Sequence, residues 1–430
     1  MSVALQLGPR PVNIAQSSGG GTAQRGLVFL TVGQSLSQRR NYSSGADKIT
    51  SVSSSAYMIA GGADRNADAD VSPNVTAFNA DGADYESLTA FVPSATQGGK
   101  VDGFAFATDR PTVAGIYAIG GRDYTELCHG GSSLFKDTAM FINQAVYLLQ
   151  QEGVSGVDIV ISFAHGEAET DNTVAGGGAG SPTSGATYKK YLEEWFWDLT
   201  LFCRAALGDP TYEPTFLVHQ MAGVFNDAWR EIMQATIEFA DETSRSVYLT
   251  GPTAPYGLEA DKTHPPGEAQ ALMGEWDWHL YQRVLNEEGT CVRALPFSKS
   301  GATITVPHTS PFGGNVEVGI NTGNMTDASG FQSSGDLCVL GVEVLNAGTR
   351  LSIASVTPSV SSTVIVLDSD PGAVDPEVRF GLMTAPGGLT AVPSTVSRCN
   401  IRSDWEGIAS AYIDGYTHEG WVIHESVEAA

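Results

Sequence analysis

The sequence predicts an α/β fold built on a parallel sheet, followed by a second, all-β region. Residues 112–286 alternate strand-like apolar runs with amphipathic helical segments, which is typical of a βαβ series. Residues 27–32, LVFLTV, form a continuous apolar run suited to a buried parallel strand. After about residue 289 the chain changes to short runs rich in Val, Thr, Ser and Ile between Gly, Asn and Asp, which predicts a sandwich or jelly roll.

The chain begins with an arm. Residues 1–26 carry two nearby prolines and a Ser/Gly tract, which predicts an extended segment before the first strand at 27–32. From residue 41 to about 110 the sequence is rich in Ser, Gly, Ala and Asp, so we expect long loops there that shape a substrate cleft.

The βαβ series itself follows from four strand-like segments and four helical ones. The strands are expected at 112–119, 157–164, 214–220 and 246–251, and the helices near 136–152, 188–207, 226–242 and 267–286. These segments divide the chain into an arm (1–26), an α/β domain (27–286), a β-rich domain (287–400) and a C-terminal segment (401–430).

Composition excludes several classes of function. The 430 residues hold 48 acidic and 23 basic side chains, a formal charge of −25, and such a surface repels nucleic acid and anionic membranes. No stretch approaches the roughly 20 apolar residues of a membrane span, and the N-terminus lacks the features of a Sec signal peptide. The five cysteines are widely spaced and form no CxxC pair, which indicates neither a disulfide framework nor a zinc site.

A candidate nucleophile and base lie at opposite ends of the α/β domain. Ser35 directly follows the strand at 27–32, where the carboxyl edge of a parallel sheet forms sites. Asp261 and His264 form a DxxH pair after the last strand. Three positions apart on a tight turn, the carboxylate can hold the imidazole so that it acts on the serine as general base. Each motif alone is weak evidence, since strand-end turns commonly hold such residues.

Two further blocks follow intervening strands. Residues 120–121 are paired glycines whose backbone N–H groups could face a developing oxyanion, and residues 165–167 read HGE. Four such blocks at successive strand ends are much less expected by chance than any one of them.

In this order the blocks resemble those of the SGNH hydrolases, specifically the carbohydrate esterases of the sialate O-acetylesterase type. The resemblance covers roughly residues 27–286 and implies a three-layer fold with a parallel sheet. It implies a triad of Ser35, Asp261 and His264, an oxyanion hole of Ser35, Gly121 and His165, and supporting roles for Gln34, Gly166 and Glu167.

Two residues depart from the family pattern. Leu36 stands where the family usually has Asn, and His165 stands where it usually has Gln, so the side-chain donor to the oxyanion is in question. His165 could donate through a ring N–H or be a buried structural residue. Neither His129 nor His219 has a second ligand at metal spacing, so no metal is assigned, and the chemistry needs no cofactor.

The resemblance implies removal of O-acetyl groups from a polysaccharide. Two alternatives stay open: an inactive glycan-binding or structural virion protein with the same fold, and a lipase-like enzyme that prefers long acyl chains. The C-terminal CNIRSDW and GWVIHESV segments are similar to the ends of phage-tail esterases, which implies a virion protein whose last segment returns to the hydrolase core. Its partners would then be further copies or other virion proteins; a cytoplasmic or non-Sec secreted protein is the other possibility.

Overall fold

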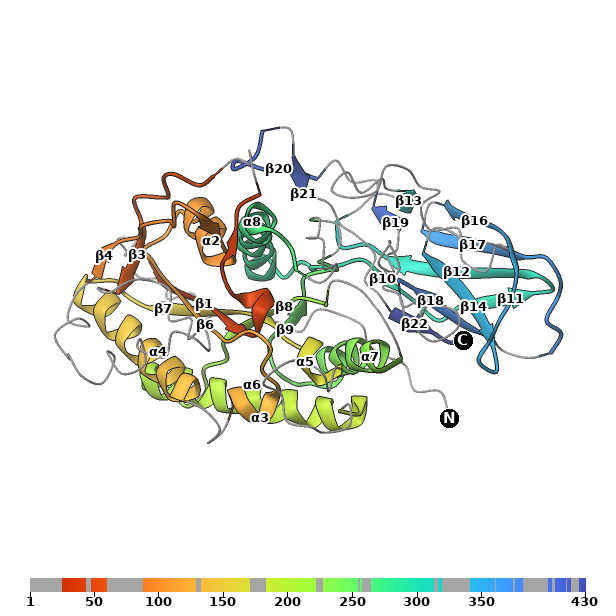
Figure 1. Ribbon diagram of the computed structural model, residues 1–430, viewed down its shortest axis with the longest axis horizontal. Helices are drawn as coiled ribbons and strands as arrows, with labels where there is room; N and C mark the ends of the chain where they lie inside the picture. Colours follow the sequence, from red (N-terminus) through yellow and green to blue (C-terminus); the bar gives the residue numbers. More distant parts are fainter. Residues whose placement is uncertain are drawn as a thin grey trace.

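The structure is a computed structural model, shown in Figure 1. It describes residues 25–43, 48–59, 88–128, 133–170, 183–221, 227–253, 256, 264–312, 316–318, 341–359, 361–373, 376–381, 401–403, 407–414, 416–418 and 425–430. The predicted arm lies almost wholly outside these residues. None of the described helices is long and apolar enough to cross a membrane.

A seven-stranded sheet with the order β4-β3-β6-β1-β7-β8-β9 forms the centre of the larger part of the molecule. Its strands are β1 (Gly26–Gly33), β3 (Ala56–Ile59), β4 (Leu88–Ala90), β6 (Thr112–Ala118), β7 (Val157–Ala164), β8 (Thr215–Val218) and β9 (Val247–Leu249). All neighbours pair in parallel except β3 and β4, which are antiparallel. The predicted strands 27–32, 112–119, 157–164, 214–220 and 246–251 are thereby confirmed to within two residues at each end.

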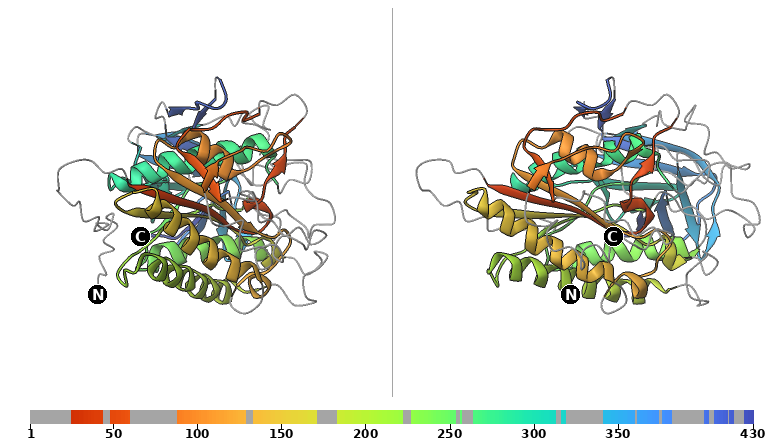
Figure 2. Two further views of the ribbon diagram at one scale, coloured as in Figure 1. Left: turned by 90° about the vertical axis from the view of Figure 1, so that its left-hand side faces the viewer. Right: turned by 60° about the vertical axis from the view of Figure 1, so that its left-hand side comes forward.

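Helices cover both faces of the sheet (Figures 1 and 2). They are α2 (Lys100–Ala107), α3 (Tyr124–Leu127), α4 (Ser133–Gln151), α5 (Glu167–Thr170), α6 (Gly185–Leu207), α7 (Asp227–Glu242) and α8 (Gly267–Leu285). The strand period of two divides β1 between the layers: Val28, Leu30 and Val32 pack with α4, α6 and α7, whereas Leu27 and Phe29 pack with α2 and α8. The four predicted helices are confirmed as α4, α6, α7 and α8.

The expectation of loops from residue 41 to 110 is wrong for β3 and β4, which are strands of the central sheet, and for α2. Val101, Phe104 and Ala105 are fully buried, and the Phe104 ring stacks on Phe29 of β1 at 3.7 Å between centroids. The helix is only eight residues long and contains Gly103, so its sequence shows little periodicity. Tertiary packing rather than helix propensity stabilises it.

The C-terminal part consists of antiparallel sheets. Its strands are β10 (Arg293–Ala294), β11 (Ser298–Ser300), β12 (Thr303–Thr309), β13 (Val316–Val318), β14 (Val342–Asn346), β15 (Thr349–Arg350), β16 (Ile353–Ser359), β17 (Ser362–Leu367), β18 (Glu377–Phe380), β19 (Ile401–Ser403), β20 (Ile408–Ala409), β21 (Thr417–His418) and β22 (Glu425–Val427). One sheet has the order β10-β12-β17-β16, with β11 on β12, and a second has the order β15-β14-β18-β22.

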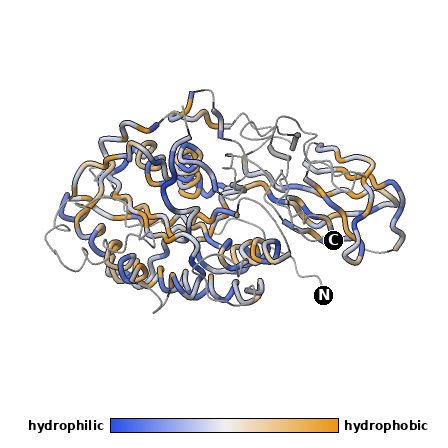
Figure 3. Tube along the Cα trace, viewed as in Figure 1, coloured by the Kyte–Doolittle hydropathy of each residue, from blue (hydrophilic) through white to orange (hydrophobic). Residues whose placement is uncertain are grey.

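These two sheets contact each other through side chains such as His308 of β12 and Phe380 of β18, whose rings lie 5.5 Å apart. Hydrophobic stretches coincide with these strands as well as with the central sheet (Figure 3). The last strand, β22, pairs with β18 of the β-rich part, whereas the hairpin β20–β21 lies against α8 through Ser410, Ala411 and His418.

Candidate active site

Ser35 lies at the carboxyl end of the central strand β1. The chain turns sharply at Gly33, whose φ is +135°, and a Cβ there would come within 2.0 Å of the Ala164 carbonyl oxygen. Only glycine fits this position. Ser35 then begins the short 3-10 helix η1 (Ser35–Ser37), and it is 9% exposed. Its backbone N–H is in the first turn of that helix, where N–H groups have no acceptor within the helix.

Strand register explains why the blocks after three different strands meet. Gly33 pairs with Ala118 of β6 on one side and with Ala164 of β7 on the other, so the three strands end at the same level. The glycine pair that follows β6 and the HGE block that follows β7 therefore leave the sheet beside Ser35, as expected for the carboxyl edge of a parallel sheet.

His264 reaches Ser35 from the far end of the domain. Its Nε2 lies 2.7 Å from Ser35 Oγ, within hydrogen-bond distance. The helix α8 begins three residues later at Gly267, which packs so closely on the short sheet of β2 (Arg40–Asn41) and β5 (Gln97–Gly98) that a Cβ would lie 2.5 Å from the Arg40 carbonyl oxygen. This contact fixes where the segment carrying His264 enters the site. Asp261 lies outside the described residues, so its role stays a prediction.

The glycine turn after β6 supplies backbone groups beside the nucleophile. A Cβ on Gly120 would lie 3.7 Å from Ser35 Cβ, and Gly121 adopts a φ of +66°. The turn therefore passes directly beside Ser35. With the Ser35 N–H, an amide of this turn can stabilise a negative oxygen formed near the hydroxyl.

His165 is held within the fold by both ring nitrogens. Nδ1 lies 3.0 Å from Tyr188 Oη and Nε2 lies 3.2 Å from the Arg122 carbonyl oxygen, while the residue is only 4% exposed. Burial also lowers the pKa of His165, which favours the neutral ring. Of the two interpretations of His165, the geometry favours the structural one over donation to an oxyanion.

Glu167 anchors Gln34, the residue that precedes Ser35. Its carboxylate accepts a hydrogen bond from Gln34 Nε2, and Gln34 Oε1 accepts another from the Ala168 N–H at 3.2 Å. Gly166, with a φ of +138°, turns the chain so that Glu167 faces inward. The supporting residues predicted from the sequence thus form a bridge from the end of β7 to the residue before Ser35.

Two ionisable side chains, Glu167 of this bridge and Lys100 of α2, are buried. Burial raises the pKa of Glu167 to about 7 and lowers the pKa of Lys100 to about 8, while each charge partly favours the other. The Lys100 ammonium group has no hydrogen-bond partner in the part of the chain that the structure describes.

A second polar cluster was not predicted. Asp277 on α8 is fully buried and accepts hydrogen bonds from Ser162 Oγ at 2.7 Å and His219 Nε2 at 2.8 Å. His219 is thus bound to α8 rather than to Ser35. A lone aspartate in the middle of an amphipathic helix gave no signal that could have identified this partner. His129, the other histidine considered as a ligand, lies outside the described residues.

No protein-family model and no curated protein matches the sequence. Among solved structures, the crystal structure of XAC1771, a carbohydrate acetylesterase from Xanthomonas citri, is similar over 93% of this chain and 80% of its own, with a TM-score of 0.55 and 14% sequence identity. The Arabidopsis thaliana protein AT4G34215 aligns with 60% of this chain and 98% of its own at a TM-score of 0.37 and 13% identity. The likeness to XAC1771 concerns the fold. It confirms the predicted fold class, an α/β domain with a mostly parallel sheet followed by antiparallel sheets.

Proposed function

We propose that this protein is a serine esterase that removes O-acetyl groups from a polysaccharide. The observation that carries the proposal is the 2.7 Å separation of His264 Nε2 and Ser35 Oγ at the carboxyl end of the central parallel strand. A histidine within hydrogen-bond distance of a serine hydroxyl is the arrangement by which a weak nucleophile is activated.

In the proposed reaction His264 Nε2 takes the proton from Ser35 Oγ as the oxygen attacks the acetyl carbonyl carbon. The N–H groups of Ser35 and Gly121 stabilise the oxyanion of the tetrahedral intermediate. His264 then gives its proton to the departing sugar oxygen, leaving an acetyl-serine. Water, deprotonated by His264, attacks this ester and releases acetate, and Ser35 regains its proton. Asp261 is proposed to orient the imidazole throughout.

The acetylated-sugar substrate rests on two supports. The order of blocks around Ser35 resembles that of sialate O-acetylesterase-type enzymes, and the solved structure with the similar fold is described as a carbohydrate acetylesterase. Acetate release from O-acetylated polysaccharides, followed by mass spectrometry before and after treatment, tests this choice. A preference for long acyl chains over acetyl would favour a lipase-like enzyme instead.

Hydrolysis of p-nitrophenyl acetate tests the catalytic groups. Ser35→Ala and His264→Gln are each expected to lower kcat by at least about 10³-fold, because nucleophile and base act as one unit. The double variant is expected to lose little more than either single variant. Ser37→Ala is a matched control, since Ser37 lies in the same 3-10 helix but its hydroxyl bonds to the Val32 carbonyl oxygen. If Ser35→Ala and His264→Gln both hydrolyse p-nitrophenyl acetate at the wild-type rate, the proposal is contradicted.

The engagement of both His165 ring nitrogens favours one alternative, an inactive glycan-binding or structural protein, because the site then lacks this side-chain donor to the oxyanion. Glycan binding by wild type and Ser35→Ala alike, without acetate release by either, would support that alternative. A virion location, with other virion proteins or further copies as partners, remains a prediction. Mass spectrometry of purified phage particles tests it.

A further inference from the structure

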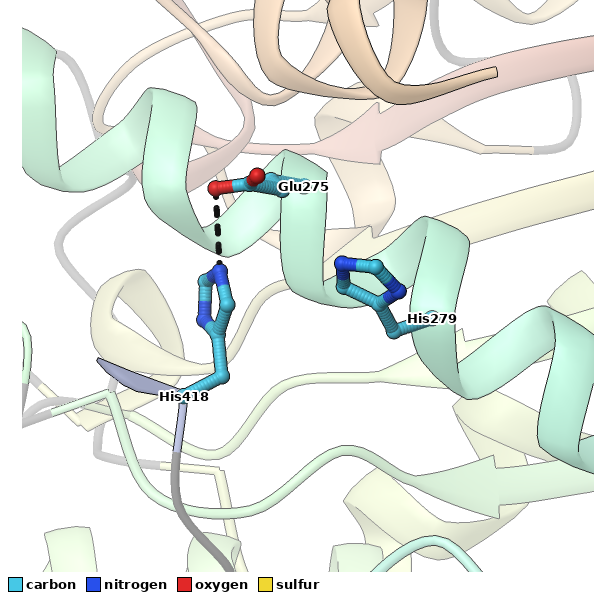
Figure 4. Close-up of side chains that lie close together, drawn as sticks. All are labelled: Glu275, His279 and His418. Carbon is cyan, nitrogen blue, oxygen red and sulfur yellow. Dashed lines mark hydrogen bonds and ion pairs between the residues drawn. The ribbon is translucent and has the colours of Figure 1, made fainter. Parts of the chain in front are cut away.

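Three side chains that can bind a metal ion meet where α8 contacts the hairpin β20–β21. Glu275 and His279 lie four positions apart on α8 and so share one face of the helix, and His418 comes from β21. One potential ligand atom from each residue lies within 4.8 Å of the others. In Figure 4 one ring nitrogen of His279 faces the Glu275 carboxylate and the His418 ring.

Two of the three are held rigidly. Glu275 Oε1 accepts a hydrogen bond from the Ala411 N–H at 2.7 Å, and Oε2 accepts from Ser410 Oγ and from His418 Nε2 at 3.0 Å. The His418 ring stacks on Trp276, with 5.4 Å between centroids and 12° between planes. Glu275 and His418 are both fully buried. Outer contacts of this kind orient the ligands of metal sites.

Within the described residues, the imidazole rings of His279 and His418 have nitrogen atoms without a hydrogen-bond partner. His279 is only partly buried, and within the described residues no hydrogen bond to its ring nitrogens is observed. His418 Nδ1 is buried without a hydrogen-bond partner in the described part of the chain. The His418 nitrogen that faces Glu275 is Nε2 (Figure 4), so an ion at the cluster binds Nε2 and leaves Nδ1 as the N–H of the ring.

We propose that Glu275, His279 and His418 bind a divalent transition-metal ion, with Zn²⁺ as the best match. Two imidazoles and one carboxylate form a nitrogen and oxygen ligand set that suits Zn²⁺, and a water molecule completes four-coordination. When the ion binds, the neutral His418 ring carries its proton on Nδ1, so that Nε2 donates its lone pair to the ion in place of the hydrogen bond to Glu275.

The position of the cluster gives the ion a structural role. It joins α8 to the hairpin β20–β21, whose strands pair at Ile408 with His418 and at Ala409 with Thr417. Glu275 lies eight residues into α8, roughly 12 Å along the helix from its first residue, whereas His264 precedes that residue. The ion therefore fastens the C-terminal hairpin to the helix that follows the proposed base, rather than acting on substrate.

A simpler alternative is that the hydrogen-bonded pair of Glu275 and His418 anchors the hairpin by itself. The two explanations differ in what they require of His279. Substitution His279→Gln leaves the contacts of Glu275 with Ser410, Ala411 and His418 in place, so it removes a ligand without removing the anchor.

The test is Zn²⁺ titration of chelator-treated full-length protein by isothermal calorimetry, with excess Mg²⁺ to suppress binding to surface carboxylates. Wild type is expected to bind one equivalent, and His279→Gln at least 10-fold more weakly. Zn²⁺ is expected to raise the Tm of wild type but not of His279→Gln, because a ligand stabilises the state that binds it. Glu288→Gln, which removes an exposed carboxylate just after the same helix, should behave as wild type. No high-affinity equivalent in wild type, or equal affinity in His279→Gln, would overturn the proposal.

Discussion

Replacing Glu167 with Gln measures how strongly this buried acid makes the free energy of unfolding depend on pH. Burial raises the pKa of Glu167 from 4.5 to about 7. Because the folded-state pKa is the higher one, its contribution to stability is fully present below about pH 4.5 and is lost as pH rises through 7. A tenfold change in proton affinity corresponds to about 1.4 kcal/mol, so the loss is on the order of 3 kcal/mol. Gln at this position cannot ionise, yet its amide oxygen can still accept the hydrogen bond from Gln34.

The assay is urea unfolding of wild type and Glu167→Gln at several values between about pH 4.5 and pH 7.5. The difference between the two proteins cancels the titrations that they share, and the range ends below the lowered pKa of about 8 of Lys100, the cation whose pKa Glu167 influences. Relative to the variant, wild type should lose on the order of 3 kcal/mol of unfolding free energy across this range. Parallel pH curves, within about 0.5 kcal/mol, would refute the reasoning that burial holds a proton on Glu167.

Two further substitutions test how the helices behind the site are held. Gly274→Ala should destabilise the protein by about 1–3 kcal/mol in urea unfolding and also lower kcat of the proposed esterase reaction, because the new Cβ would lie 1.9 Å from the Lys100 carbonyl oxygen and push α8 away from α2. Gly156→Ala is the control. Its new Cβ meets only the end of the flexible Arg25 side chain, at 2.9 Å, so it should change stability little. Arg39→Ala should cost about 3–5 kcal/mol, since it leaves the fully buried Asp102 carboxylate without its cation. Equal unfolding midpoints for the two glycine variants, or an Arg39 variant as stable as wild type, would contradict these expectations.

The parts of the fold that could be predicted are those whose signal is local. The strand β1 is a continuous apolar run, and α6 repeats its buried residues at helical spacing, so each was readable without its neighbours. The helix α2 was not, because its eight residues contain a glycine and form a helix only when packed between the sheet and α8. Only the crossing of α2 and α8 explains why positions 103 and 274 are glycine. At each position the missing side chain lets one helix approach the backbone of the other.

For the candidate site, the sequence by itself predicted which blocks gather at the strand ends: Ser35 after β1, the glycine pair after β6 and Glu167 after β7. Parallel strands end at a common edge, so order along the chain was enough to group these blocks. Only the tertiary structure decided what the remaining polar groups face. It turns both nitrogens of His165 into the fold and places His418 on Glu275 across 143 positions. The pairing of His264 with Ser35 across 229 positions was expected from the order of the blocks, but its distance comes from the structure. Contacts over such separations depend on the packing of whole elements, which no local pattern records.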